Sequence, residues 1–588
     1  MPNHDSDRIY RKNEKRVTQS PPGSDSLQGT KEKEKTRPVP RPDKEDYINN
    51  IIMRSELKRL PLGIQTFSEI REGNYLYVDK TDLIYGLTYN HKYVFLSRPR
   101  RFGKSLLCST LASYFEGRKD LFEGLAIEKL ETEWRQHPVL RFDLSVVKKG
   151  TAEDLFIMLD GQLGRYEEEY GVTSISQSVG ERFRNLIEAS VRVKGEKAVV
   201  IIDEYDAPVL NVLHDPERLQ VIREGMRDFF APLKYCDPYL RFTFLTGVTK
   251  FSQLSIFSEL NNLAKISMTP RYSTICGITQ EELETQLRPW VERLAVKLGI
   301  TPDEALAELK KNYDGYHFAS DLKDIYNPYS LLNAFDQEEM KDFWFDTGTP
   351  TSLINMLLKF GTNVADLDNG CEVEENEFNA PAEKMLTPMP FFYQGGYLTI
   401  KAYDSNFQTY QLRYPNREVR NGMIQALIPY YIEPNPISAK SEIIALYKAI
   451  LSDNLDEGLR NLQAYLAGIP YAENANSEGH FQTMLYVVFS LLGRYAQTEV
   501  RTATGRIDIV LKNKTDIYVM ELKIDRPAQE ALDQIDQKGY LVPYTTDERR
   551  LHKVGIAFST ETRTLSEWKI ATPRRATKEK EKTRPVPK

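Results

Sequence analysis

The sequence has few cysteines, few histidines and no long apolar run. The four cysteines lie far apart without a C-x-x-C pair, which argues against a disulfide framework and a structural zinc site. The seven histidines are scattered and indicate no metal-binding triad. No apolar stretch approaches the roughly 20 residues of a transmembrane helix, and the first residues lack the apolar segment of a secretory signal. We therefore expect a cytoplasmic protein that does not bind a membrane.

Strong net charge is also missing. The formal net charge is -6 over 588 residues, which predicts no general attraction of the chain to nucleic acid, so such binding must come from a local site. The hydrophobic content of 41% is ordinary for folded protein. The length predicts about two to four domains.

Composition divides the chain into five segments. Polar, charged residues predict disordered tails at 1–59 and 573–588, because such segments bury too little apolar surface to offset chain entropy. The motif T-K-E-K-E-K-T-R-P-V-P occurs at 30–40 and again at 577–587. We interpret it as low-complexity sequence rather than as a pair of docking segments. Between the tails we expect three ordered regions, at 60–285, 286–470 and 471–572.

The region 60–285 alternates apolar strands with helical stretches, which predicts an α/β fold with a parallel sheet covered by helices. Four short runs rich in β-branched and aromatic residues are typical of buried parallel strands, at 92–97, 139–144, 198–203 and 241–246. The region 286–470 is predicted to be mostly helical, after a capping-box start at Thr279. Its aromatic run at 343–345 is interpreted as core rather than as a base-stacking platform.

The stretch at 97–105 reads S-R-P-R-R-F-G-K-S and raises the question of a phosphate-binding loop. The usual pattern is G-x-x-x-x-G-K-[ST], and Arg98 stands where the first glycine is expected. A strand before the stretch and an apolar helix after it give the order that such a loop requires. Gly103 would let the backbone approach phosphate, Lys104 would reach the β and γ oxygens, and Ser105 would ligate magnesium.

The arginines of this stretch are candidate nucleotide ligands. Arg98 is compatible with a phosphate loop if Pro99 sets a different turn and if the guanidinium group of Arg98, Arg100 or Arg101 faces phosphate or a neighbouring domain. The alternative for the isolated stretch is a basic surface turn. A second motif is needed to decide between the two.

The second motif is A-V-V-I-I-D-E-Y-D, a hydrophobic strand that ends in adjacent carboxylates. Asp203 would hold magnesium through water, and Glu204 would orient or deprotonate an attacking water. The next strand ends near Thr246 and Thr249, which are candidate γ-phosphate sensors, although strand ends are often threonine in any fold. Together the motifs predict ATP and Mg²⁺ as cofactors.

The segment 505–525 predicts a β-hairpin with acids and a lysine that converge. Strand periodicity places Glu521 and Lys523 on one face, and Asp508 stands on the preceding strand. Metal-dependent phosphodiester cleavage needs hard oxygen ligands for Mg²⁺, which Asp508 and Glu521 would supply, and a lysine that positions water or stabilises developing charge. The alternative is a hairpin whose charged side faces solvent.

These motifs, taken as a set, resemble the predicted AAA-ATPase-like family that is joined to a C-terminal PD-(D/E)XK nuclease-like domain. The resemblance covers about 60–572 and includes the arginine-rich form of the phosphate loop. It implies a P-loop AAA-like sheet with a helical lid, followed by an α/β restriction-endonuclease-like domain. The motifs that carry it are L-P-L-G-I-Q-T-F (60–67), N-Y-L-Y-V-D-K-T (74–81), S-R-P-R-R-F-G-K-S-L-L (97–107), I-I-D-E-Y-D-A-P (201–208), T-G-V-T-K-F-S (246–252), N-Y-D-G-Y-H-F (312–318), Y-N-P-Y-S-L-L (326–332) and W-F-D-T-G-T-P (344–350).

The resemblance also assigns residues around the hairpin. Glu478 matches the helical acid of the nuclease-like family and would join Asp508 and Glu521 as a metal ligand, while Glu499 is a further candidate. The stretch A-L-D-Q-I-D-Q-K-G-Y resembles the helix that follows the core, with matching positions at Gln534, Lys538 and Tyr540.

Our first functional hypothesis is an ATPase coupled to a magnesium-dependent nuclease. We expect its substrate to be DNA rather than RNA. A second is a nucleotide-gated switch or scaffold whose C-terminal domain binds nucleic acid or protein without cleaving it. A third keeps the ATPase and makes the C-terminal domain a docking module. The sequence leaves open whether copies of the chain assemble into a homo-oligomer.

Overall fold

The structure is a computed structural model of the 588-residue chain. It describes residues 57–573, with gaps at 146–150, 174–177, 214, 250–261, 348–350, 361, 363, 376, 380–386, 432–440, 442–443, 447, 450–451, 453, 469–482, 489, 491–498, 504–505 and 513–514. Glu478 and the predicted tails, except residues 57–59 and 573, lie outside the described residues. None of the described helices is long and apolar enough to cross a membrane.

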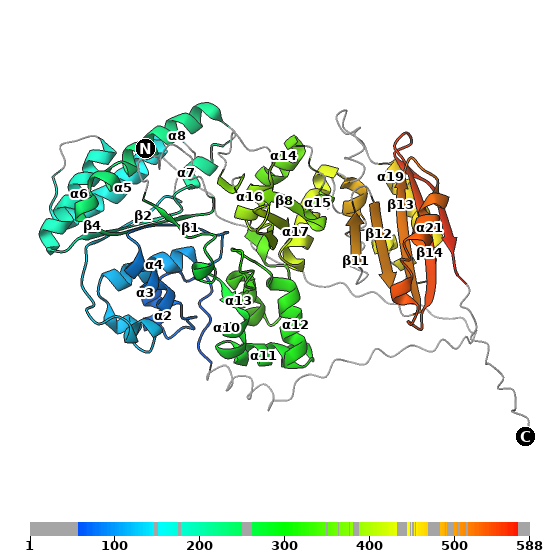
Figure 1. The fold of residues 1–588 in the computed structure, drawn as a ribbon, viewed down its shortest axis with the longest axis horizontal. Coiled ribbons are helices and arrows are strands. Elements are labelled where there is room, and N and C mark those ends of the chain that lie inside the picture. The colour runs from blue at the N-terminus through cyan, green and yellow to red at the C-terminus, as the bar shows by residue number, and fades with distance from the viewer. Residues whose placement is uncertain are drawn as a thin grey trace, which may run out of the picture. The chain divides into compact units, whose positions relative to one another are not determined.

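The first ordered region contains a five-stranded parallel sheet (Figure 1). Its strands have the order β2-β3-β4-β1-β5, and the four predicted strands are confirmed. The fifth has only two residues and was not predicted. The strands are β1 (Tyr93–Ser97), β2 (Val139–Asp143), β3 (Ala198–Asp203), β4 (Leu240–Gly247) and β5 (Ala264–Lys265).

Helices cover both faces of this sheet, because its central strands are apolar on both sides. Val199 and Ile201 pack in one core cluster with α4, whereas Val200 and Ile202 pack in another with α5, α6 and α8. The helices are α2 (Phe67–Glu72), α3 (Thr81–Asn90), α4 (Lys104–Phe115), α5 (Ala152–Tyr170), α6 (Val179–Lys194), α7 (Ala207–Leu210), α8 (Pro216–Phe230) and α9 (Pro232–Tyr235). The alternation of buried side chains thus fixes which face each helix covers.

The next region is helical at its start, and Thr279 and Glu282 form the predicted capping box. The region to residue 470 is mostly helical, as expected, but it also contains an antiparallel sheet that was not predicted, with the order β8-β10-β9. The elements are β6 (Ile278–Thr279), α10 (Gln280–Thr285), α11 (Arg288–Leu298), α12 (Pro302–Tyr313), β7 (Ile325–Tyr326), α13 (Pro328–Gln337), η5 (Trp344–Thr347), α14 (Thr351–Phe360), α15 (Ala365–Asn369), β8 (Cys371–Glu374), α16 (Met389–Gln394), β9 (Thr399–Asp404), β10 (Thr409–Arg413), α17 (Arg417–Tyr431) and α19 (Leu455–Ala467).

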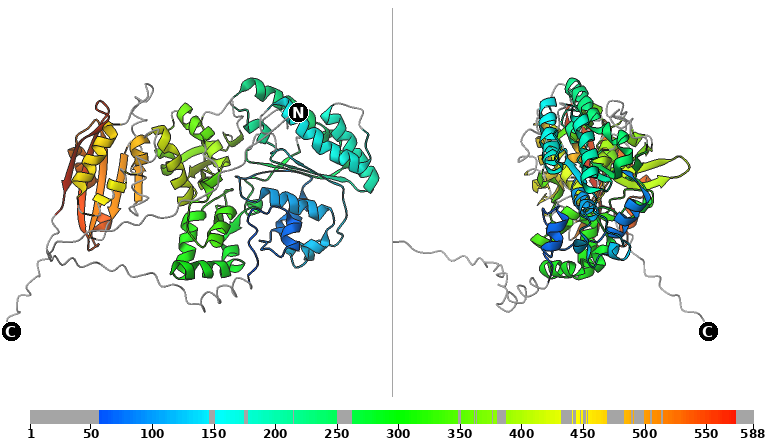
Figure 2. Two further views of the ribbon diagram at one scale, coloured as in Figure 1. Left: turned by 180° about the vertical axis from the view of Figure 1, so that it is seen from behind. Right: turned by 90° about the vertical axis from the view of Figure 1, so that its left-hand side faces the viewer.

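The last region is a mixed sheet with the order β11-β12-β13-β14-β15, in which only β13 and β14 run parallel. The predicted hairpin is confirmed as β12 and β13. Helix α21 covers one face (Figure 1), and α19 packs on β15 at the other face (Figure 2). The elements are β11 (Glu499–Ala503), β12 (Arg506–Lys512), β13 (Asp516–Ile524), α21 (Ala528–Gln537), β14 (Arg550–Ser559) and β15 (Thr564–Ala571).

Candidate nucleotide-binding and nuclease-like sites

The loop between β1 and α4 has the local geometry of an anion cradle. Gly103 has φ 89° and forms the N-cap of α4, a left-handed conformation that favours glycine. A Cβ built on Gly103 would meet no atom of the described residues within 4 Å, so they leave the loop open at this point. The first backbone N–H groups of α4 have no partners within the helix and attract anions. The loop therefore has room and donors for a phosphate group.

Lys104 is the first residue of α4, and its ammonium group contacts the backbone of this loop. Its Nζ donates to the carbonyl oxygen of Pro99 at 3.2 Å and lies 3.6 Å from Oε1 of Glu204. Lys104 is only 4% exposed. Burial and two partners therefore hold the ammonium in place before any ligand arrives.

The acids that follow β3 face this helix. Asp203 is buried, and burial raises the pKa of its carboxyl group, while a hydrogen bond from Ser105 lowers it. Glu204 also raises the pKa of Asp203, and Glu204 has φ 51°, a strained value for this residue type. The structure thus brings together the hydroxyl, the lysine and both carboxylates that the two motifs predicted. A hydroxyl and a carboxylate are the oxygen donors that Mg²⁺ accepts, so this donor set fits the ion.

Threonines at the end of β4 complete this edge of the sheet. The Thr246 side chain is completely buried, and its hydroxyl has no hydrogen-bond partner among the residues that the structure describes. The Thr249 hydroxyl instead donates to Oδ2 of Asp206 at 2.5 Å. Because β4 lies between β1 and β3, its end lies between the loop and the acids. Thr246 is consequently the better placed of the two predicted sensors.

Asp206 is a residue that we did not single out from the sequence, although it belongs to the D-E-Y-D run. Its carboxylate accepts from the backbone N–H of Thr249 at 2.6 Å and of Val248 at 3.1 Å. Burial, followed by the charge of Glu204, raises the pKa of Asp206 to about 6. A Cβ on Gly247 would approach Oδ1 of Asp206 to 2.3 Å, so only glycine fits there. Asp206 thereby fixes the chain that follows β4.

The prediction that Arg98 contacts phosphate is wrong for this structure. Its guanidinium is buried and donates to four backbone carbonyls, and it lies 4.3 Å from the ring centre of Phe318. The four acceptors belong to Ser97, Ser267, Tyr272 and Ser273. Arg98 therefore has a structural role: its hydrogen bonds connect the start of the loop to the chain that follows β5.

The other residues of the loop contact the helical region, as the sequence analysis allowed. Arg101 has φ 69°, and its Nη1 donates to the carbonyl oxygens of Trp344 at 2.9 Å and Phe343 at 3.4 Å. The Phe102 ring packs edge-on against Tyr316 and also against the Trp344 ring. Phe343 and Trp344 are buried, which confirms the interpretation of this aromatic run as core.

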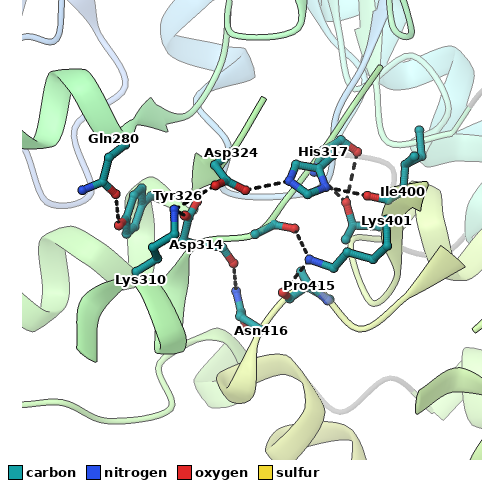
Figure 3. Close-up of polar contacts among 12 residues, drawn as sticks. Gln280, Lys310, Asp314, His317, Asp324, Tyr326, Ile400, Lys401, Pro415 and Asn416 are labelled. Carbon is teal, nitrogen blue, oxygen red and sulfur yellow. Dashed lines mark hydrogen bonds and ion pairs between the residues drawn. The ribbon is translucent and has the colours of Figure 1, made fainter. Parts of the chain in front are cut away.

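A polar network holds the segment that carries Tyr316 (Figure 3). His317 bridges the carbonyl oxygen of Ile400, 2.6 Å from Nδ1, and Oδ1 of Asp324, 2.7 Å from Nε2. Lys401 donates to the carbonyl oxygen of Gly315 at 2.7 Å, and burial lowers the pKa of Lys401 to about 8. The network thus supports the aromatic surface on which Phe102 packs.

A mostly apolar cavity of about 110 Å³ lies beside the loop. Phe102 and Gly103 line it from the loop, Val78 and Ile84 from the chain before β1, and Leu332 from α13. An apolar cleft next to a phosphate cradle suits the flat ring of a nucleotide base.

In the C-terminal sheet, Glu521 and Lys523 lie on the same face of β13, as predicted. Lys523 Nζ donates to Oε1 of Glu521 at 3.0 Å and to Oε1 of Gln534 on α21 at 2.5 Å. Glu521 is fully buried. The backbone register sets residue 508 of β12 directly opposite residue 521. The pairing of the strands therefore brings both predicted metal-binding positions to one level of the sheet.

The remaining nuclease-like residues are more scattered. Glu499 begins β11, opposite Val510 of β12. Lys538 is the exposed C-cap of α21, and Tyr540 packs on the small core beneath that helix. Within the part of the chain that the structure describes, no three His, Cys, Asp or Glu side chains gather closely enough to hold a metal ion.

Comparisons with known proteins add two family matches and one relative. A family model described as Predicted AAA-ATPase matches residues 61–257, and one described as PD-(D/E)XK nuclease superfamily matches residues 476–568. A protein from Azotobacter chroococcum mcd 1, described as "Uncharacterized protein in vnfD 5'region", is 36% identical over 521 residues. The aligned part covers 86% of this chain and 98% of the relative.

Proposed function

We propose a function that starts from the family to which this chain belongs, the predicted AAA-ATPases that carry a C-terminal domain of the PD-(D/E)XK nuclease superfamily. The chain binds and hydrolyses ATP with Mg²⁺. Its C-terminal domain cleaves nucleic acid with Mg²⁺, under the control of the nucleotide. DNA is the substrate that we propose first.

The observation that carries the ATPase proposal is the contact between α4 and the end of β3. Lys104 lies 3.6 Å from Glu204, and Ser105 hydrogen-bonds to Asp203. In this arrangement Lys104 would neutralise the β and γ oxygens, and Ser105 and Asp203 would hold Mg²⁺, which neutralises phosphate charge. Glu204 would accept a proton from the attacking water.

The burial of these groups supports hydrolysis as well as binding. Lys104 and Asp203 are each less than 5% exposed, so their charges act in a medium that screens them weakly. The orphaned Thr246 hydroxyl can donate to an oxygen of the terminal phosphate without first giving up another partner. The apolar cavity beside Gly103 would hold the base.

The nuclease proposal rests on Lys523, Glu521 and the register of the hairpin. Lys523 and Glu521 are paired at 3.0 Å, and position 508 stands opposite Glu521. Asp508, Glu521 and Glu478 would supply the carboxylates for Mg²⁺, which lowers the pKa of a bound water. Lys523, held by Gln534, would orient that water or stabilise the charge on phosphate.

A second candidate function is a nucleotide-gated switch whose C-terminal domain grips nucleic acid without cleaving it. The contacts of Arg101 and Phe102 with η5 favour this candidate, because they join the nucleotide loop to the helical region. Magnesium-independent binding without any product would support the switch.

The ATPase part is tested by binding and hydrolysis of ATP by the purified chain. The proposal predicts magnesium-dependent turnover, loss of binding in Lys104→Ala, and retained binding without turnover in Glu204→Gln. Lys92→Ala, which alters a surface lysine paired with Asp237, is the matched control. Equal turnover in all four proteins would contradict the proposal.

A further inference from the structure

The first turn of α17 contacts two separate segments of the helical region, η5 and α15. On one side Oε1 of Glu418 accepts the backbone N–H of Trp344 at 2.7 Å. On another side Arg420 Nε donates to both carboxylate oxygens of Asp368, at 2.7 and 3.0 Å. Residues two apart on a helix point in different directions, so α17 holds two neighbours at once.

The contact between α17 and η5 is close. A Cβ on Gly422 would come within 1.9 Å of the Phe345 ring, so α17 meets η5 at a point where only glycine fits. The carbonyl oxygen of Trp344, on the same residue that donates to Glu418, accepts from Arg101 in the nucleotide loop. A movement of η5 must therefore reach both Arg101 and α17.

The opposite contact of α17 leads to the nuclease-like domain. The Tyr486 hydroxyl donates to Oδ2 of Asp368 at 2.7 Å, and Arg420 Nη2 donates to the Ser490 hydroxyl at 3.3 Å. Tyr486 is fully buried, and both residues lie within the stretch 476–568 that matches the nuclease superfamily. Helix α15, which carries Asp368, also packs on β11.

We propose that Arg101 is a nucleotide-dependent latch and that α17 carries its release to the nuclease-like domain through Arg420, Asp368 and Tyr486. This inference rests on the proposed nucleotide binding. It adds a route by which the nucleotide regulates the second site.

The contacts of the latch differ in strength between its two states. In this structure the Arg101 guanidinium donates to two neutral carbonyls and lies 4.0 Å from the centre of the Tyr329 ring. A phosphate in the loop offers it an anionic acceptor, and the attraction between opposite full charges exceeds that between a charge and a carbonyl dipole. Arg101 would then leave η5, which releases the clamp on Glu418 and loosens α17. The ligand thereby distinguishes two states, as a coupled system requires.

Hydrogen exchange of the full-length chain tests the latch without any need for cleavage. On addition of magnesium ATP, we expect slower exchange in residues 98–107 and exchange about fivefold faster in residues 483–488, which is the low end of typical coupling. Tyr486→Phe removes the hydroxyl that bonds to Asp368 and keeps the buried ring. It should retain the response of the loop and reduce the change at 483–488 to less than about twofold.

Two controls separate the latch from folding and from the proposed function. Tyr518→Phe makes the same change in β13, where Tyr518 stacks on His552, and it should respond as the unaltered chain does. Two results would overturn the latch alone. One is nucleotide protection of 98–107 without faster exchange at 483–488. The other is exchange at 483–488 that rises in Tyr486→Phe as much as in the unaltered chain. Failure of the loop itself to respond would overturn both the latch and the proposed nucleotide binding.

Discussion

The two lysine–glutamate pairs of this molecule are built in different ways. Lys104 and Glu204 lie on a helix N-terminus and at a strand end, 100 positions apart, and meet at 3.6 Å. Lys523 and Glu521 are two positions apart on β13 and meet at 3.0 Å. The first pair requires the whole parallel sheet, whereas the second follows from strand periodicity alone.

This difference teaches how much each pair says about function. A lysine and an acid at alternate strand positions occur in many hairpins, so the second pair gains meaning from Gln534 and from position 508 opposite Glu521. The first pair is informative by itself, because it joins residues that are distant in the sequence, beside an open loop at a helix N-terminus that attracts anions.

The largest effect is expected from a substitution that breaks the pair of Lys104 and Glu204. Lys104→Ala should lower ATP turnover by about 1,000-fold, because it removes a fixed positive charge from the phosphate site. Any metal-dependent cleavage that occurs without ATP should be unchanged in Lys104→Ala. Steady-state phosphate release measures the first quantity, with Lys92→Ala as control. Turnover within about tenfold of the unaltered chain would show that the pair is only structural.

The next effect breaks the second pair. Glu521→Gln keeps the shape of the side chain but removes the charge, so magnesium-dependent cleavage should fall by about 100-fold or more while ATP turnover persists. Gel-based assays measure cleavage, steady-state phosphate release measures ATP turnover, and a melting curve checks that the variant is folded. Glu530→Gln, on the exposed first turn of α21, is the control. Undiminished cleavage by Glu521→Gln would assign the pair of Lys523 and Glu521 a structural or binding role.

A smaller effect sharpens the account of the first site. Asp206→Asn should reduce ATP turnover by about tenfold, because an amide replaces one of the acceptors that hold Thr249 and Val248. The pKa of Asp206 is about 6 in the folded chain, so turnover of the unaltered chain should decline as the pH falls through 6. The variant should lack that step. Asp303→Asn, on exposed α12, is the control, and identical pH profiles would refute this role.

The smallest effect concerns α17, which lies between the two sites. Burial raises the pKa of Glu418 to about 8 from 4.5, so the folded chain holds a proton that the unfolded chain releases between these values. Stability should therefore fall as the pH rises from 4.5 to about 8, by at most about 1.4 kcal/mol per pH unit. Glu418→Gln should flatten this slope in melting curves, and equal slopes in both proteins would contradict the burial account.

Much of the fold could be predicted, because its strands leave strong patterns. β1 and β3 are buried at every position, and all of β1 to β4 were found from their short runs of β-branched and aromatic residues. The hairpin of β12 and β13 was visible from its alternation and polar turn. β5 has two residues and leaves no pattern. The sheet of β8, β9 and β10 was missed, because its short strands stand among helices and only Tyr410 and Leu412 alternate clearly in β10.

The sites divide in the same way. Gly103, Lys104, Ser105, Asp203 and Glu204 could be predicted to converge, because strand and helix ends meet at one edge of a parallel sheet. The position of Arg98 could not be predicted from the sequence. Its acceptors near residue 270 are backbone carbonyls, which every residue has, so no sequence pattern indicates them. Asp206 was visible in D-E-Y-D, but its partners follow a different strand.

The measurement that tests the central claim most directly is cleavage of mixed single- and double-stranded DNA and RNA by the purified chain, with magnesium and with or without ATP. Lys104→Ala and Glu521→Gln are assayed beside the unaltered chain. The account predicts that the unaltered chain cleaves nucleic acid and that Glu521→Gln abolishes this cleavage. It also predicts that cleavage by Lys104→Ala no longer depends on ATP. Absence of cleavage of every substrate, with ATP turnover still lost in Lys104→Ala, would contradict the nuclease and leave the nucleotide-gated switch.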